Sequence, residues 1–425
     1  MSQDRFARRL LVAGCAAAVA VGALAACSSS SGSSATSGDS TGGASAGGTY
    51  TLWDPYPQLD ASSPWAQTIN ECGSKAGVTI KRTAYDTTDL TNKVLLAAQQ
   101  GAAPNVLVVD NPVVSTLAEG GVLQSTESLK LDTSQIEPNI LAAGQLNGKT
   151  YGVPIGANTL ALYYNKKILS KAGVDPSSIK DWSSLTAALA KVAATGKKGI
   201  TFSGIGTEEG SFQFLPWFWG AGANLTDLSS SQAQAALNLW KTWLDKGYAP
   251  NSVLQNTQTT SWQEFATGDF AFGENGTWNL ANAKKAGFPF GVLPIPGMNG
   301  GSAPAPTGGE FVTVPTNSDS SKSATAAKIV SCLTGPDHAL ATDTALTYVS
   351  AIDSIQQKQV AADPDLKNWV AAVHSAKGRT SDNLGTKYPK ISQPMWNAVQ
   401  AALSGSKSVQ QALSDAQSQA KSAGA

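Results

Sequence analysis

Aromatic and carboxylate side chains follow directly after three short segments of strand-like composition. The pairs are Trp53-Asp54, Tyr85-Asp86 and Asp110-Asn111. Carboxylates and amides exchange hydrogen bonds with polar ligands, and flat aromatic rings offer apolar faces to ring-shaped ones. In open parallel sheets, ligands sit beyond the carboxyl ends of the strands. The spacing therefore predicts a polar binding site with aromatic walls at this edge of a sheet.

The segments between these pairs alternate between strand and helix patterns. Strands are expected at 50–53, 78–82 and 105–109, and helices at about 65–76 and 90–98. The third strand is uniformly apolar, as is typical of a strand covered on both faces. Such alternation indicates a parallel sheet with right-handed crossovers, so the expected fold class is α/β.

A second unit with similar alternation is expected to begin near residue 151. Strands are predicted at 159–164, 199–202, 270–272 and 311–314, and helices at 166–172, 183–194, 322–334 and 336–345. Three sequences match the capping box and predict helix starts: Ser229…Gln232, Ser261…Glu264 and Ser408…Gln411. Trp240 and Trp243 are interpreted as core residues, because Trp240 lies on the apolar face of the helix that begins near Ala233.

An export signal is predicted at the amino terminus. A basic start is followed by an uncharged run at 10–26 and by Cys27, which is typical of a lipoprotein signal whose cysteine carries a diacylglycerol. An ordinary signal peptide or a membrane anchor is the alternative, but the run is short for a span of about 20 apolar residues. We expect 1–26 to be removed, 27–48 to form a flexible Ser/Gly linker, and Cys27 to anchor the protein outside the cytoplasmic membrane.

Composition narrows the classes of partner. Lys plus Arg and Asp plus Glu both number 30, so no net basic charge suits a nucleic acid. Charged residues make up only 14% while Trp numbers 11, which favours neutral ring-shaped ligands such as carbohydrates, although at least half of the Trp residues are expected in the core. Cys72 and Cys332 are predicted to form a disulfide in an oxidising compartment; two separate buried thiols are the alternative.

Sequence signatures of catalysis are missing. The chain has no P-loop, zinc-binding, HExxH or GxSxG pattern. His338 and His374 are interpreted as solvent-facing, and the adjacent Glu208-Glu209 as a solvated pair. We therefore predict no enzymatic activity, no cofactor and no metal. A carboxylate pair for glycoside hydrolysis stays open, because its spacing is spatial rather than sequential.

The order of several short strings is similar to that of a known family. The strings are GAAPNV at 101–106, KTYGVP at 149–154, FATGDFAF at 265–272 followed by Trp278, TGG at 307–309 and SVQQAL at 408–413. Over nearly all of 49–425 the chain resembles the maltose-binding-protein-like group of extracellular solute-binding proteins, which deliver sugars to ABC importers.

The resemblance implies a two-lobed periplasmic-binding-protein-like fold, in which each lobe is a sheet flanked by helices and the ligand binds in the cleft between them. It implies a first lobe of 49–155 and 306–350 and a second of 156–305 and 351–425. Cys72 and Cys332 would then both fall in the first lobe, which supports their pairing.

The resemblance also implies a set of binding residues. Within the 214–220 segment we prefer Trp219 over Trp217. The acidic-basic pair of the maltose type is not evident after the third strand, so maltose itself is not predicted. The candidates are Trp53, Asp54, Tyr56, Asp110, Asn111, Asn158, Trp219, Trp278, Gly309, Glu310 and Trp396.

The expected function is that of a lipid-anchored receptor that binds a mono- or oligosaccharide and delivers it to the permease subunits of an ABC importer, as a monomer. The same fold binding a polyol, a glycerophosphodiester or a polyamine is the alternative. Only Arg82 and Arg379 follow the signal, which disfavours a phosphate ligand. A surface glycoside hydrolase and a non-transport adhesin are remoter alternatives.

Overall fold

The computed structural model describes residues 47–316, 319–380 and 384–425. The predicted signal peptide, Cys27 and most of the predicted linker lie outside these residues. The linker prediction is wrong at its end, because strand β1 (Gly47–Asp54) begins two residues earlier and pairs with β2 from Gly47 onward. Within the described parts of the chain, no helix has the length and apolar character needed to cross a bilayer.

The first sheet contains five strands in the order β2-β1-β3-β11-β6. β1 pairs in parallel with both β2 and β3, which confirms the parallel arrangement expected from the sequence, whereas β11 pairs antiparallel with β3 and β6. In β3, four consecutive residues are buried, as expected for a strand covered on both faces. The remaining strands are β2 (Val78–Ala84), β3 (Val106–Asp110), β6 (Val153–Pro154) and β11 (Glu310–Thr313).

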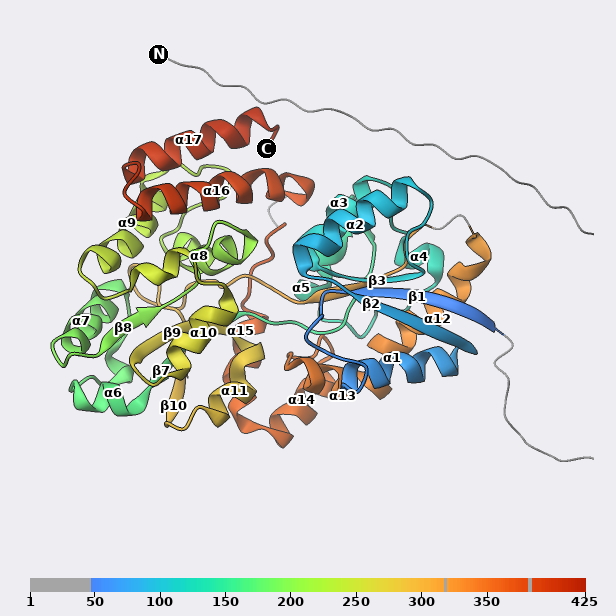
Figure 1. The fold of residues 1–425 in the computed structure, drawn as a ribbon, viewed down its shortest axis with the longest axis horizontal. Helices are drawn as coiled ribbons and strands as arrows, with labels where there is room; N and C mark the ends of the chain where they lie inside the picture. The colour runs from blue at the N-terminus through green and yellow to red at the C-terminus, as the bar shows by residue number, and fades with distance from the viewer. Residues whose placement is uncertain (1–46, 317–318, 381–383) are drawn as a thin grey trace, which may run out of the picture. The chain divides into compact units, whose positions relative to one another are not determined.

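The second sheet contains four strands in the order β10-β7-β9-β8. Here β8 is parallel to β9, and β7 is antiparallel to β9 and β10. Its strands are β7 (Leu160–Asn165), β8 (Lys198–Thr201), β9 (Phe270–Gly276) and β10 (Phe290–Leu293). Figure 1 shows the two sheets in separate parts of the body, each with helices packed around it.

Helices and short strands complete both parts. Those near the first sheet are α1 (Pro64–Lys75), α2 (Thr87–Gln99), α3 (Asn111–Glu119), α4 (Thr126–Leu129), α5 (Pro138–Leu141), β4 (Gln145–Leu146), β5 (Lys149–Thr150), α12 (Ser323–Thr334) and α13 (Pro336–Leu346). The others are α6 (Lys166–Lys171), α7 (Trp182–Ala193), α8 (Glu208–Gly220), α9 (Ser231–Asp245), α10 (Gln258–Ala266), α11 (Leu280–Lys285), α14 (Asp353–Ala362), α15 (Lys367–His374), α16 (Tyr388–Leu403) and α17 (Val409–Ser422).

The chain passes between the sheets more than once. The second sheet is built from the stretch between β6 and β11, two strands of the first sheet. At the crossing, isolated bridges join Ala157 to Val349 and Asn158 to Gly308, so three segments distant in sequence lie side by side. Because these segments are short and hydrogen-bonded, they place the carboxyl end of β3 opposite the start of α8.

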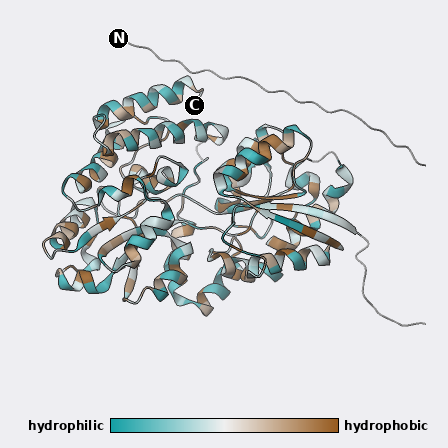
Figure 2. Cartoon of the chain, in the orientation of Figure 1, coloured by the Kyte–Doolittle hydropathy of each residue, from teal (hydrophilic) through white to brown (hydrophobic). Residues whose placement is uncertain are grey.

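Aromatic residues dominate the core of the second part. Trp240 and Trp243 are fully buried, which confirms their predicted core role, and Trp217 packs edge-on against Trp243. Figure 2 shows hydrophobic and hydrophilic residues alternating along the helices, as expected for amphipathic helices packed on sheets.

Two of the three predicted helix starts are wrong. Ser230 rather than Ser229 caps α9, accepting a hydrogen bond from the Ala233 amide. Thr257 caps α10, and Ser261 lies inside that helix, where its hydroxyl donates to a backbone carbonyl. The start at Ser408 is confirmed, because its side chain accepts a hydrogen bond from the Gln411 amide. Several serines and threonines crowd each boundary, and the pattern alone does not choose among them.

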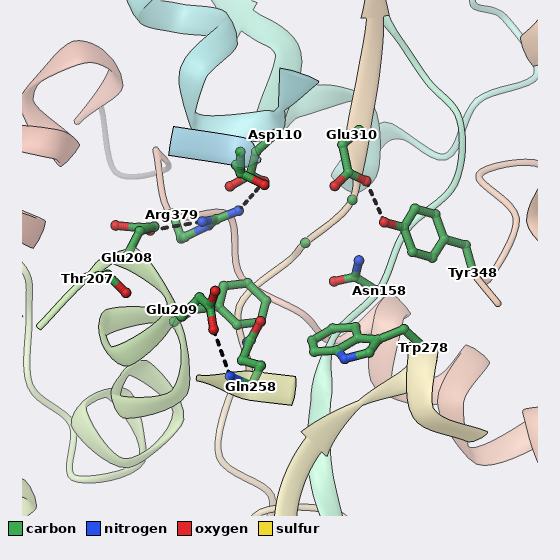
Figure 3. Close-up of a pocket in the computed structure, with 14 residues that line it drawn as sticks. Asp110, Asn158, Thr207, Glu208, Glu209, Gln258, Trp278, Glu310, Tyr348 and Arg379 are labelled. Atoms are coloured by element: carbon green, nitrogen blue, oxygen red, sulfur yellow. Dashed lines mark hydrogen bonds and ion pairs between the residues drawn. The ribbon is translucent and has the colours of Figure 1, made fainter. Parts of the chain in front are cut away.

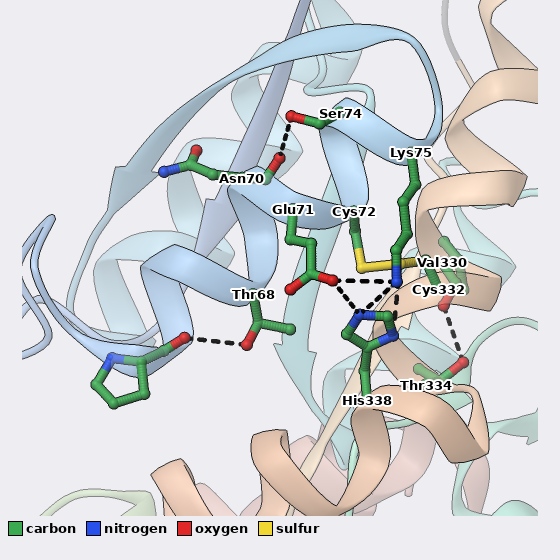
Figure 4. The surroundings of a disulfide bond; sticks show 11 residues. Thr68, Asn70, Glu71, Cys72, Ser74, Lys75, Val330, Cys332, Thr334 and His338 are labelled. Atoms are coloured by element: carbon green, nitrogen blue, oxygen red, sulfur yellow. Dashed lines mark hydrogen bonds and ion pairs between the residues drawn. A yellow bond between two sulfur atoms is a disulfide. The ribbon is translucent and has the colours of Figure 1, made fainter.

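The disulfide between Cys72 and Cys332 is present and joins α1 to α12, which confirms that prediction. Figure 4 shows His338 beside it with Glu71 and Lys75. The solvent-facing prediction for His338 is wrong: the residue is 8% exposed, and its ring lies 3.1 Å from the Lys75 ammonium and 3.3 Å from the Glu71 carboxylate. Although His338 lies near both sulfurs, cysteines joined to each other offer no thiolate to a metal ion.

Candidate ligand-binding site between the two sheets

A cavity of about 280 Å³ is lined by residues from both parts of the body. One wall comes from the first sheet, where Asp110 ends β3 and Glu310 begins β11. The opposite wall comes from the start of α8 and from Trp278, in the turn after β9. Figure 3 shows carboxylates on both walls, with the Trp278 indole and Asn158 on one side. The lining residues are Thr87, Asp110, Asn158, Thr207, Glu208, Glu209, Phe212, Gln258, Trp278, Gly308, Gly309, Glu310, Tyr348 and Arg379.

The wall from the first sheet holds two carboxylates on neighbouring strands. Asp110 and Glu310 face each other across the β3–β11 pair. The hydroxyls of Tyr56 and Tyr348 both donate to Glu310 Oε2, at 2.8 and 2.5 Å. Burial and then the neighbouring Asp110 charge raise the pKa of Glu310 to about 7, against the opposing effect of these hydrogen bonds. This carboxyl group therefore changes its charge near neutral pH.

Arg379 links the two walls. Its guanidinium donates to Asp110 Oδ1 at 2.7 Å and to Glu208 Oε1 at 2.9 Å, and it lies 4.8 Å from the centre of the Phe212 ring. The residue is only 2% exposed. Two carboxylates and an aromatic face therefore compensate its buried charge from three directions.

Glu208 and Glu209 occupy the first turn of α8, where the helix dipole favours negative charge. Glu208 also accepts hydrogen bonds from the hydroxyls of Tyr388 at 2.6 Å and Ser392 at 2.5 Å, both on α16. Glu209 accepts a hydrogen bond from the backbone amide of Gln258 at 2.7 Å. The interpretation of these two glutamates as a solvated pair is wrong, because both line the cavity.

Two glycines let the chain pass close to the cavity floor. A Cβ on Gly308 would lie 1.9 Å from the Asn158 Oδ1, and Gly309 has a φ of +109°, which side chains with a Cβ rarely adopt. Substitution at either position would displace Asn158 or the Gly156–Ala157 backbone. Glycine is therefore needed here for backbone placement.

The structure brings five of the predicted binding residues into this cavity. They are Asp110, Asn158, Trp278, Gly309 and Glu310. Tyr56 lies just behind the wall, since it hydrogen-bonds to Glu310. Asn111 is also behind it, accepting from Arg379 at 3.2 Å and donating to the Thr307 carbonyl at 2.9 Å.

The other predicted residues lie elsewhere. Asp54 is fully buried and pairs with Arg82 and the Trp65 indole, so it serves the core of the first part rather than a ligand. Trp53 packs edge-on against Tyr85, outside the lining. These two predictions fail because β1 ends at Asp54, and its last side chains are used in pairing and packing.

Neither tryptophan of the 214–220 segment lines the cavity. Trp217 is buried and donates to Glu274 at 2.8 Å, and Trp219 is 6% exposed beneath the Lys377 ammonium. Trp396 is partly exposed on α16, one helical turn beyond Ser392, and is likewise outside the lining. All three sit on helices whose inward faces serve packing first.

Sequence reasoning missed several residues of the lining. Arg379 lies in an irregular segment after α15 and matches no motif, so its only signal was the rarity of arginine in this chain. Tyr348, Phe212 and Gln258 gave no local signal either. Their positions follow from where α13, α8 and α10 pack, which no spacing rule reveals.

Known proteins resemble this chain in sequence and in fold. The family model "Bacterial extracellular solute-binding protein" matches residues 67–368. The maltodextrin-binding protein MdxE of Bacillus subtilis is 28% identical over 243 residues, which cover 55% of this chain and 57% of that protein. The match thus spans little more than half of that relative's length.

Solved structures share the fold. A solute-binding protein of an ABC transporter from Thermotoga lettingae, bound with α-D-tagatose, has a TM-score of 0.77 at 23% identity and covers 88% of this chain and 99% of that one. UgpB from Mycobacterium tuberculosis, in complex with glycerophosphocholine, has a TM-score of 0.76 at 21% identity and covers 88% and 98%. These likenesses confirm the predicted two-lobed α/β fold. With the family match over most of its length, the chain belongs to the bacterial extracellular solute-binding proteins.

Proposed function

We propose that this protein is an extracytoplasmic receptor that binds a mono- or oligosaccharide in the cavity between the two sheets and delivers it to an ABC importer. The observation that carries the proposal is the composition of the cavity lining. The rings of Trp278 and Phe212 lie about 6.4 Å apart between side chains that donate or accept hydrogen bonds, such as Asn158 and Gln258. Aromatic faces next to amides and carboxylates match a sugar, which has apolar C–H faces and a rim of hydroxyls.

The size of the cavity supports a small saccharide. Pockets for drug-sized ligands commonly measure about 300–1,000 Å³, and this cavity of about 280 Å³ lies just below that range. A mono- or disaccharide suits this volume, and a longer chain would need the lobes to be further apart. The lobe boundaries proposed from the sequence, 49–155 with 306–350 and 156–305 with 351–425, place the two walls in different lobes.

Binding would then be coupled to lobe closure. A sugar that touches both walls stabilises the closed form, because only there are all its contacts made. The importer's permease subunits would recognise that form. Cys27 would carry the lipid anchor and the segment after it would act as a tether. We propose a monomer that acts without cofactor or catalysis.

A glycerophosphodiester is less favoured by the lining. Phosphate recognition by arginine uses a free planar fork, but the Arg379 guanidinium is already shared between Asp110 and Glu208. The carboxylates Glu209 and Glu310 would repel an anion at the same site. The charge of the cavity therefore supports an uncharged or positively charged ligand.

Isothermal titration calorimetry of the protein without residues 1–27 against a broad panel of sugars tests the proposal. A dissociation constant near the micromolar range, about −8 kcal/mol, is expected for at least one sugar. Failure of every sugar, together with clear binding of a peptide or a metal ion, would overturn the assignment. The anchor is tested separately: palmitate incorporation in cells should be lost in Cys27→Ala.

A further inference from the structure

The cavity carries more negative than positive charge. Among the described residues, four carboxylates line it, those of Asp110, Glu208, Glu209 and Glu310, against one guanidinium, that of Arg379. Both hydrogen-bonding arms of Arg379 are used, one by Asp110 and one by Glu208. Its face rests on Phe212. Arg379 therefore acts as the counter-ion of two wall carboxylates and leaves the other two uncompensated.

Glu310 has no cationic partner among the described residues. Its carboxylate accepts hydrogen bonds from two neutral phenols, those of Tyr56 and Tyr348, and lies opposite the Asp110 charge on the paired strand. Asp110 raises its pKa further, after burial, and the more distant Arg379 only partly opposes this. A positive charge placed beside Glu310 would thus relieve a repulsion that the protein itself leaves in place.

Glu209 likewise forms no ion pair within the described parts of the chain. Among the described residues, it accepts a hydrogen bond from the Gln258 backbone amide at 2.7 Å, a neutral donor. The α8 amino terminus supplies only a partial positive charge, which it shares with Glu208. Trp278, which lines the same cavity, presents an indole, and the face of an indole attracts cations.

From this arrangement we infer that the preferred ligand is a basic saccharide, a sugar that carries a protonated amine directed at the Glu209 or Glu310 carboxylate. The inference rests on the proposed sugar-binding function and specifies its substrate class. A neutral sugar could donate hydroxyl protons to the same oxygens, but it would leave their charge uncompensated in a partly buried site. An ammonium group donates the hydrogen bonds and supplies the charge together.

Matched ligands test the inference. Calorimetry at pH 6.5 and low ionic strength would compare three forms of each sugar that fits: the parent, its 2-amino-2-deoxy form and the N-acetylated amine. The amino form should bind at least tenfold more tightly than both uncharged forms. The N-acetyl compound controls for the shape of the substituent without its charge.

Substitutions identify which carboxylate contacts the amine. Glu310→Gln and Glu209→Gln keep the hydrogen-bonding shape and remove the charge, so at least one should reduce the preference for the amino form fivefold or more. Glu119→Gln is the matched control, because Glu119 is exposed at the far end of α3 and outside the lining. It should leave the preference unchanged. Thermal melting of each variant confirms that it folds.

Proton linkage gives an independent readout. A cation near Glu310 favours its ionised form, so binding near pH 7 should release protons, detected as a dependence of the binding enthalpy on the ionisation enthalpy of the buffer. The groups that face this carboxyl are Asp110, Tyr56, Tyr348 and Arg379, and burial raises the pKa of both phenols well above the usual value. Proton release should vanish in Glu310→Gln if the amine sits at this residue.

The outcomes separate the two levels of the proposal. Tighter binding of the amino form, weakened by either glutamine variant, supports the inference. Equal or tighter binding of the parent sugar overturns the basic-saccharide inference and leaves the sugar receptor standing. Binding of a linear polyamine with no binding of any sugar overturns both.

Discussion

The two walls of the cavity are built by different means. On the first side, polar groups come from the ends of paired strands, where Asp110 and Glu310 stand opposite each other. On the second, they come from the first turn of α8 and from the turn that holds Trp278. Polar residues at the carboxyl ends of parallel strands indicate a binding site. Acidic residues in the first turn of a helix are common wherever a helix begins, so they do not by themselves indicate one. A binding role is therefore easier to infer on the first side than on the second.

The two sides also differ in what stabilises them. The first is closed by a disulfide between residues 260 apart in sequence. The second relies on an aromatic core that includes Trp182, Trp217, Trp240 and Trp243. A cross-link acts chiefly by restricting the unfolded chain, while an aromatic core acts through burial in the folded one. The four predictions below test this contrast.

The largest effect is expected from removing the cross-link. Replacing Cys72 and Cys332 together by Ala should lower the free energy of unfolding by about 4 kcal/mol, because so long a loop is no longer closed in the unfolded state. Amide hydrogen exchange should become faster in both sheets, because β7–β9 lie within the loop that the disulfide closes. Faster exchange in β1, β2 and α1 alone would mean that the bond acts locally in the folded state.

Arg379→Met should cause the second largest loss in the free energy of unfolding. It removes the counter-ion shared by Asp110 and Glu208 and leaves two like charges at the junction of the walls. Removing one partner of a buried ion pair costs about 3–5 kcal/mol, and the lower end applies here because the Glu208 side chain is 33% exposed. Urea unfolding at pH 7.5 measures the loss. An unchanged free energy of unfolding would show that the two ion pairs contribute nothing to stability.

The Glu310 carboxyl should make stability fall as pH rises. Its pKa is raised from 4.5 to about 7 in the folded protein, so the native state holds the extra proton between these values. The contribution of this proton to the free energy of unfolding is complete below pH 4.5 and is lost as the pH rises through about 7. The shift corresponds to at most about 3 kcal/mol, and partial exposure of Glu310 in the cavity reduces this to about 2 kcal/mol.

Comparison of the wild type with Glu310→Gln isolates the contribution of Glu310 to the pH dependence of stability. Burial raises the pKa of Glu274 and Asp343 as well, so both proteins should lose stability with rising pH. The free energy of unfolding of the apo-proteins between pH 5 and pH 8 should fall more steeply in the wild type. Parallel profiles would mean that Glu310 titrates alike in the folded and unfolded states.

Trp278→Ala should weaken binding of any cognate sugar by more than tenfold, about 1.4 kcal/mol, through loss of the stacking face. The far-ultraviolet circular dichroism spectrum should stay that of the wild type, since Trp278 is only partly buried at the cavity edge. Trp278→Phe keeps a ring and should lose less. Unchanged affinity in the alanine variant would remove this residue from the site.

Periodic and compositional signals predicted most of the first half of the fold. The alternation of apolar runs located β1, β2, β3 and the helices between them, because a parallel strand covered on both faces leaves an uninterrupted apolar run such as 106–109. Capping boxes were less reliable: Ser230 and Thr257 took the cap positions from Ser229 and Ser261. The choice between neighbouring hydroxyls depends on where the helix packs.

The candidate site was predicted only where local order determines it. Asp110 was located from its place at the end of a predicted strand, whereas Glu310 and Trp278 were predicted from the family resemblance. Arg379, Tyr348 and Gln258 lie 69, 38 and 52 residues along the chain from Glu310, yet all of them line the same cavity. No local pattern encodes that approach.

The sequence by itself determined the fold class, the pairing of Cys72 with Cys332 and the strand-end part of the site, because these depend on apolar periodicity, cysteine number and family resemblance. Only the tertiary structure decided which acids share Arg379, which carboxyl lacks a counter-ion and which tryptophans face the cavity. Charge compensation and burial depend on distances between segments far apart in the chain, and those distances exist only after the two sheets have packed.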